Sequence, residues 1–210
     1  AFNGLEKPLR DLDHIQGAPS YLLMLYLLIR KDDLRMDNNK LLSTASLLVR
    51  FFVRRNLTDT PPTRDLSRLF MAVIDKISSL RGNAIPQTIQ DQLVAASASD
   101  EIFQSKLEGP IYDENSGVTR FILCALAEQA MTKETWVDLW RFENRRFVWT
   151  IEHIFPQGEN IPQSWVTMIA DGDVQKAKDN QQTHVHKLGN LTISGFNSVL
   201  GNKSFEEKRD

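Results

Sequence analysis

The sequence lacks several features that would assign it to a specialised class. It has one cysteine in 210 residues, Cys124, so no disulfide can form within the chain, which is typical of a reducing, cytoplasmic compartment. The longest apolar run, YLLMLYLLI, is about half of the roughly 20 residues that a membrane span needs, and the polar start, AFNGLEKPLRDLD, contains no secretory signal. A net charge of −2 gives no electrostatic indication of a nucleic-acid partner. These absences favour an ordinary globular protein.

What is present is mostly helical patterning. Residues 63–77 place apolar side chains at three- and four-residue spacing, which predicts one buried helical stripe. Residues 20–31 are apolar nearly all round, so a central, buried helix is expected there. Proline, glycine and asparagine punctuate the segments between the helices. Further helices are predicted at 41–55, 99–107, 118–130 and 135–146.

The pattern changes near residue 147. Residues 147–155 alternate with a period of two, which predicts a strand, and Leu191–Ile193 is a second short strand candidate. A loop and a helix over 164–179 separate the two strands, and helix-like spacing returns over 196–209. The predicted fold is therefore mainly α, with a helical domain over residues 1–146 and a small ββα unit over residues 147–210.

The predicted ββα unit carries residues suited to one kind of chemistry. Glu152 can hold a cation, and His153 can take a proton from water near neutral pH. Asn190, Asn197 and Asn202 supply amide oxygens, which are hard ligands suited to Mg²⁺ or Ca²⁺. A base that activates water, beside a metal that polarises a phosphate, is the equipment for phosphodiester hydrolysis.

Three blocks in this region resemble a known family. They are similar to the HNH, or His-Me finger, nuclease signature. The version they resemble lies in the C-terminal half of GmrSD-type modification-dependent restriction endonucleases. In chain order the blocks are IEHIFPQ, HKLGNLTI and FNSVLGNKSFEEKR. Gly201 stands where that pattern has a serine. The segment that precedes the nuclease in this family is also similar to two stretches of this chain, YLLMLYLLIR and LLVRFFVRRNLTDTPPTRDLSRLF. The resemblance therefore spans most of the chain.

The resemblance implies a role for each matching residue. His153 would be the general base, Glu152 would sit at a divalent metal, Mg²⁺ or Mn²⁺, and Asn190 would tie the finger together through hydrogen bonds to the backbone. His186 would support this site or contact a phosphate. The DNA backbone would be met by the basic residues of the last element, Lys203, Lys208 and Arg209, for which plain surface is the alternative.

Either of two asparagines in residues 196–209 could be the metal ligand. Asn197 and Asn202 are five residues apart, so on one continuous helix their side chains would diverge by about 140°. Gly201 permits a break, and Ser204 with Glu207 has the spacing of a capping box that starts a second helix. We expect Asn197 to be the ligand and Asn202 to support the turn or touch DNA. The alternative for Asn197 is a helix N-cap.

The implied partner is double-stranded DNA, modified in the case of these relatives. Full-length relatives carry an N-terminal nucleotide-hydrolysing sensor domain, which nothing in residues 1–210 resembles, and they continue beyond the EEKR element. We therefore expect the chain to be the nuclease half of a larger protein.

Two other interpretations compete with the nuclease. A zinc hydrolase would use His153, His184 and His186 as three nitrogen ligands and leave one position for water. A helical scaffold with a degenerate finger would only bind DNA or a partner subunit. Metal analysis separates the first from the nuclease, and binding without cleavage identifies the second.

Overall fold

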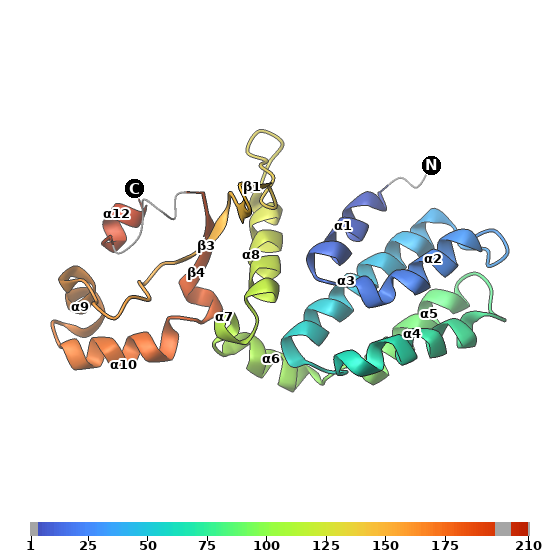
Figure 1. Cartoon of the computed structure of the whole chain (residues 1–210), viewed down its shortest axis with the longest axis horizontal. Coiled ribbons are helices and arrows are strands. Elements are labelled where there is room, and N and C mark those ends of the chain that lie inside the picture. Colours follow the sequence, from blue (N-terminus) through green and yellow to red (C-terminus); the bar gives the residue numbers. More distant parts are fainter. Residues whose placement is uncertain (1–3, 196–202, 210) are drawn as a thin grey trace. The chain divides into compact units, whose positions relative to one another are not determined.

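The computed structural model describes residues 4–195 and 203–209, and the chain divides into two compact units, residues 1–104 and 105–210 (Figure 1). The protein is mainly α-helical, as predicted. Helices α7 (Ile111–Glu114) and α8 (Ser116–Ala130) belong to the same unit as the strands, so that unit begins well before residue 147. The boundary that we place at 146/147, between a helical domain and a nuclease finger, stays a prediction. In the described residues, no helix is long and apolar enough to span a membrane.

In its described part, residues 4–104, the first unit contains helices and no strand. Its helix α4 (Thr63–Ile77) buries the stripe that the spacing predicts, with Leu66, Phe70, Val73 and Ile77 each almost fully inaccessible to solvent. Helix α3 packs against α1 and α5, and α4 packs against α2 and α5 (Figure 1). The elements are α1 (Glu6–His14), η1 (Ala18–Ser20), α2 (Tyr21–Ile29), α3 (Asn38–Thr58), α4 (Thr63–Ile77), α5 (Ala84–Ala96) and most of α6 (Asp100–Glu108).

One expectation for this unit was wrong. Helix α2 is not buried all round, because it buries only Leu23, Met24 and Leu27, whereas Ile29 is 80% exposed. A segment that is apolar on both sides has no polar face to indicate which side meets solvent. Its pattern therefore predicts the helix correctly but not its burial.

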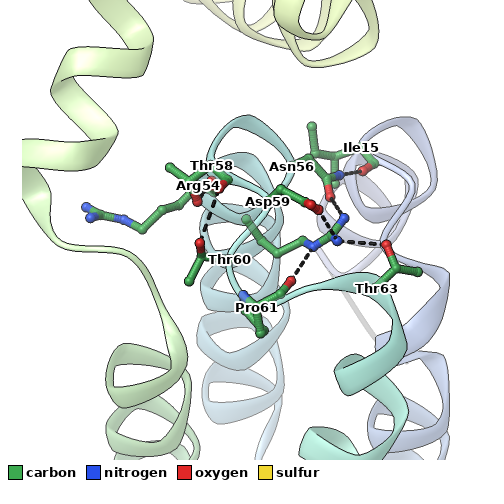
Figure 2. Close-up of polar contacts among 9 residues, drawn as sticks. Ile15, Arg54, Asn56, Thr58, Asp59, Thr60, Pro61 and Thr63 are labelled. Carbon is green, nitrogen blue, oxygen red and sulfur yellow. Dashed lines mark hydrogen bonds and ion pairs between the residues drawn. The ribbon is translucent and has the colours of Figure 1, made fainter.

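The junction between α3 and α4 is held by polar contacts (Figure 2). The guanidinium of Arg55 donates to the carbonyl of Pro61 at 2.9 Å, the carboxylate of Asp59 at 2.7 Å and the hydroxyl of Thr63 at 2.7 Å. The amide of Asn56 donates to the backbone carbonyl of Ile15 at 2.6 Å, which joins α3 to the end of α1. Arg55 therefore stabilises the junction between the two helices.

The second unit combines helices with two small antiparallel sheets, β1–β2 and β3–β4. Its elements are α7 (Ile111–Glu114), α8 (Ser116–Ala130), β1 (Phe142–Glu143), β2 (Arg146–Phe147), β3 (Thr150–His153), α9 (Gln163–Ala170), α10 (Val174–His184), η2 (Leu188–Asn190), β4 (Leu191–Ser194) and α12 (Phe205–Arg209). Strand β4 is the strand predicted near Leu191. Strand β3 is shorter than the alternation over 147–155 suggests.

Two predicted helices in this unit need correction. Residues 135–146 form turns and the β1–β2 hairpin, because Asn144 and Arg145 adopt φ angles of 49° and 64°, and positive φ at both central residues is what the favoured two-residue hairpin turn requires. The helix expected over 164–179 is broken into α9 and α10. Asp171 and Gly172 end α9 with φ angles of 53° and 92°.

Arg120 on α8 holds the start of β3 in place. Its guanidinium donates to the carbonyls of Trp149 at 2.7 Å and Leu139 at 2.6 Å and lies 3.7 Å from the ring centroid of Phe147. A buried carbonyl left without a donor is costly, so these two bonds fix the chain on both sides of the hairpin. Helix α8 is thereby joined to the strand that carries Glu152 and His153.

Candidate active site

Glu152 and His153 lie at the end of β3, opposite Thr192 and Leu191 of β4. Both polar side chains are buried, with exposures of 6% and 5%. They line a cavity of about 570 Å³, whose wall also includes Tyr112, Ser116, Gly117, Arg120, Phe147, Thr150, Ile151, Pro156 and Gln157. A buried carboxylate and a buried imidazole that follow one another in a cavity wall make this cavity the candidate site.

The environment of His153 keeps its imidazole neutral. Burial, followed by the effects of His186 and Lys208, lowers the pKa of His153 to about 4, while Asp113 acts in the opposite direction. Desolvation disfavours the charged form of a histidine, and nearby positive charges add to the effect. At neutral pH the ring is therefore neutral, with a proton on one nitrogen and a lone pair on the other.

Glu152 is paired with Lys208. The ammonium of Lys208 donates to Glu152 Oε1 at 2.6 Å and to the backbone carbonyl of His153 at 2.8 Å, and the two side chains of the ion pair are only 6% and 7% exposed. The structure therefore places the Lys208 ammonium next to Glu152, whereas the family resemblance implies that it contacts the DNA backbone. For Lys203 and Arg209, contact with the DNA backbone stays a prediction.

Helix α12 is held against the rest of the unit near this ion pair. The capping box expected from the sequence is confirmed, because the Ser204 amide donates to Glu207 Oε2 at 2.9 Å and the Glu207 amide donates to Ser204 Oγ at 3.3 Å. The indole of Trp165 donates to the carbonyl of Lys203 at 2.8 Å, and its ring meets Phe205 edge-on. These contacts bring Lys208 to Glu152.

Asn190 joins the segments on either side of the site. Its side-chain oxygen accepts from the Phe155 amide at 2.7 Å, and its amide group donates to the carbonyls of Phe155 at 3.1 Å and Val185 at 2.9 Å. It precedes β4 and fixes the chain just after β3. These bonds are the side-chain to backbone hydrogen bonds that the sequence predicts for Asn190.

The side chains of His186, Asp113 and Tyr112 form a further group next to His153. Nδ1 of His186 is 3.3 Å from Nε2 of His153, and Nε2 of His186 is 3.6 Å from Asp113 Oδ1. The ring of Tyr112 stacks on His186 and meets His153 edge-on. The sequence indicates His186 but not Tyr112 or Asp113, because they lie in the four-residue helix α7, far from every motif.

Comparison with known families shows which family contains the part of the chain that carries this site. Residues 97–210 match the family described as GmrSD restriction endonucleases, C-terminal domain. The chain belongs to this family. No curated protein and no solved structure matches it. The matched segment contains every residue of the site described above.

Within this GmrSD C-terminal domain, the zinc alternative is not supported. In the described residues, which include His153, His184 and His186, no three histidine, cysteine or acidic side chains are placed to hold a metal ion. The alternative required alternating histidines on a strand. Instead, His184 ends helix α10 with an exposed side chain, while His186 turns toward His153.

The metal site implied for this family is not formed by the described residues of the GmrSD domain as they stand. Oε1 of Glu152 accepts from the Lys208 ammonium, so this carboxylate is already paired with a cation. The other two predicted ligands, Asn197 and Asn202, lie outside the described residues, together with Gly201.

Proposed function

We propose that the chain is a metal-dependent DNA endonuclease of the HNH type. The observation that carries the proposal is the buried His153 next to Glu152, in the wall of a cavity of about 570 Å³ within the segment that matches the GmrSD family. Strands β3 and β4, with α12 against them, are proposed to form the ββα finger. The family description names restriction endonucleases, which supports DNA as the substrate.

The proposed reaction is hydrolysis of a phosphodiester. His153 takes a proton from a water molecule, and the water oxygen forms a bond to phosphorus as the bond from phosphorus to the departing sugar oxygen breaks. Proton transfer by a positioned side chain accelerates such steps by roughly 10²–10⁴-fold. Arg120 and Asn190 contribute by holding the two ends of the segment that carries His153.

The proposal assigns a divalent metal, Mg²⁺ or Mn²⁺, to Glu152. This ion would polarise the phosphate and stabilise the departing oxyanion. Because Lys208 occupies the carboxylate, metal binding requires the ammonium to withdraw, and the metal and Lys208 then compete for Glu152.

Modified DNA is the proposed substrate class, and an N-terminal nucleotide-hydrolysing sensor domain or subunit is the proposed partner. The support for both is the match to a family of restriction endonucleases. Neither assignment affects the chemistry at His153.

Cleavage of supercoiled plasmid tests the function directly. We expect nicked and then linear DNA with Mg²⁺ or Mn²⁺, and no cleavage when EDTA is present. Unmodified and modified plasmids run side by side show whether the chain itself discriminates between them. Cleavage that is unaffected by EDTA would contradict the assignment of a metal-dependent endonuclease.

Removing the Lys208 ammonium should increase metal affinity. In Lys208→Met, Glu152 loses a buried partner, and the loss of one member of such a pair costs about 3–5 kcal/mol, so we expect Mn²⁺ to bind at least roughly tenfold more tightly. Free Mn²⁺ measured by electron paramagnetic resonance reports the affinity without any need for activity. Lys203→Met removes the same charge from the same segment and serves as the control. Equal Mn²⁺ affinity in Lys208→Met and the parent would disprove competition.

A degenerate finger that only binds DNA or a partner subunit is the second candidate function. The buried Lys208–Glu152 pair favours it, because a carboxylate that is permanently neutralised by an ammonium holds no metal. In that case the parent would bind DNA without cleaving it, and His153→Ala would bind equally well.

A further inference from the structure

His153 is the first member of a row of three polar side chains. Its Nε2 lies 3.3 Å from Nδ1 of His186, and Nε2 of His186 lies 3.6 Å from Asp113 Oδ1. We propose that His186 and Asp113 are positioning residues that hold His153 in the tautomer with a proton on Nε2 and a lone pair on Nδ1. The catalytic consequence rests on the proposed function, whereas the tautomer itself does not.

The tautomer of His153 follows from the charge of Asp113 and from the hydrogen bond between the two histidine rings. A neutral imidazole carries a proton on one nitrogen and a lone pair on the other, so two ring nitrogens in contact must be one donor and one acceptor. At 3.6 Å, Asp113 is beyond hydrogen-bond distance from His186, but its negative charge favours a proton on the nearer nitrogen, Nε2. Nδ1 of His186 is then the acceptor. Nε2 of His153 must donate to it, which leaves Nδ1 of His153 to accept a proton from water.

Tyr112 fixes the geometry of the two rings. Its ring lies 5.6 Å from the His186 ring at an interplanar angle of 12°, and 4.8 Å from the His153 ring at 81°. Its backbone amide also donates to the carbonyl of His186 at 3.2 Å. Because Asp113 follows Tyr112 directly, the same short helix presents both the ring and the carboxylate to His186.

The two positioning residues should not contribute equally. The side chain of His186 is 24% exposed, whereas that of Asp113 is 60% exposed, so water screens the Asp113 charge. Loss of a residue that orients a functional histidine typically costs roughly 10–100-fold in activity, and we expect His186→Ala to fall in that range. Asp113→Asn should have a smaller effect in the same direction.

The tautomer is measured by two-dimensional ¹H–¹⁵N correlation of the imidazole nitrogens in the whole chain. Only four histidines are present, so the signals can be assigned by single substitutions. We expect a protonated Nε2 and a bare Nδ1 on His153 in the parent, and a mixture of tautomers in His186→Ala. Asp113→Asn should shift His186 toward a mixture, while Glu114→Gln, the neighbouring carboxylate that pairs with Lys106, should not.

The kinetics of DNA cleavage by the His186 variants test the catalytic consequence. We expect His186→Ala to lower kcat with KM nearly unchanged, and His186→Gln, whose amide oxygen can still accept from His153, to recover most of the loss. A proton on Nδ1 of His153 in the parent overturns the proposal, as does a His186→Gln variant that is as impaired as His186→Ala. If the parent cleaves no DNA, the proposed function fails, and the nitrogen spectra alone decide the tautomer.

Discussion

Replacing His153 with alanine is expected to lower the rate of plasmid cleavage by a factor of roughly 10²–10⁴, because the variant has no general base. The side chain is 5% exposed and burial lowers its pKa to about 4, so its ring is unprotonated at neutral pH. The decrease should lie in kcat, since the imidazole is proposed to act on water rather than to bind DNA. Single-turnover cleavage of a supercoiled plasmid measures this rate without interference from product release.

His184→Ala is the matched control for His153→Ala. It removes a second imidazole from the same unit, but His184 is exposed at the end of α10 and makes no contact with His153 that the structure records. We expect it to cleave like the parent. An alanine variant of His153 that is folded and as active as the parent would remove this residue from the mechanism.

Asn190→Ala should be among the most destabilising single changes in the second unit. The substitution leaves the Phe155 amide and the carbonyls of Phe155 and Val185 without their partner, and both of these residues are buried. At about 1 kcal/mol for each hydrogen bond, the free energy of unfolding should fall by about 3 kcal/mol. Urea denaturation followed by circular dichroism gives this quantity.

Asn180→Ala provides the comparison for Asn190→Ala. Its amide makes one recorded bond, of 3.3 Å, to the carbonyl of Ile169, so about 1 kcal/mol or less should be lost. Equal unfolding free energies for the two alanine variants would mean that Asn190 does not join the segments around β3 and β4.

Much of the candidate site was predictable because its residues lie in local patterns. The alternation near Glu152 and His153 indicates a strand, and Leu191–Ile193 indicates its partner. Ser204 and Glu207 have the spacing of a capping box, which depends only on residues three apart and forms as expected. The core of α4 is predictable for the same reason, since a helical stripe is a local feature.

Tertiary contacts account for what the sequence did not indicate. Residues 135–146 have helix-like spacing, but Arg120 binds the Leu139 carbonyl and a hairpin turn forms at Asn144. Asp113 and Lys208 reach the site from elements 40 and 55 residues away from His153 in the sequence, a separation over which spacing carries no information. The family resemblance implied a DNA contact for Lys208, and it gave no indication that the ammonium pairs with Glu152.

Chemical rescue of His153→Ala by free imidazole tests most directly that the His153 side chain is the base. The substitution removes a ring from the wall of a cavity of about 570 Å³, so imidazole has room to enter. Plasmid cleavage by the variant should rise with imidazole concentration until the site is saturated, while the parent and the His184→Ala variant should not respond. A folded, DNA-binding His153→Ala variant whose rate is unchanged at every imidazole concentration would contradict the account.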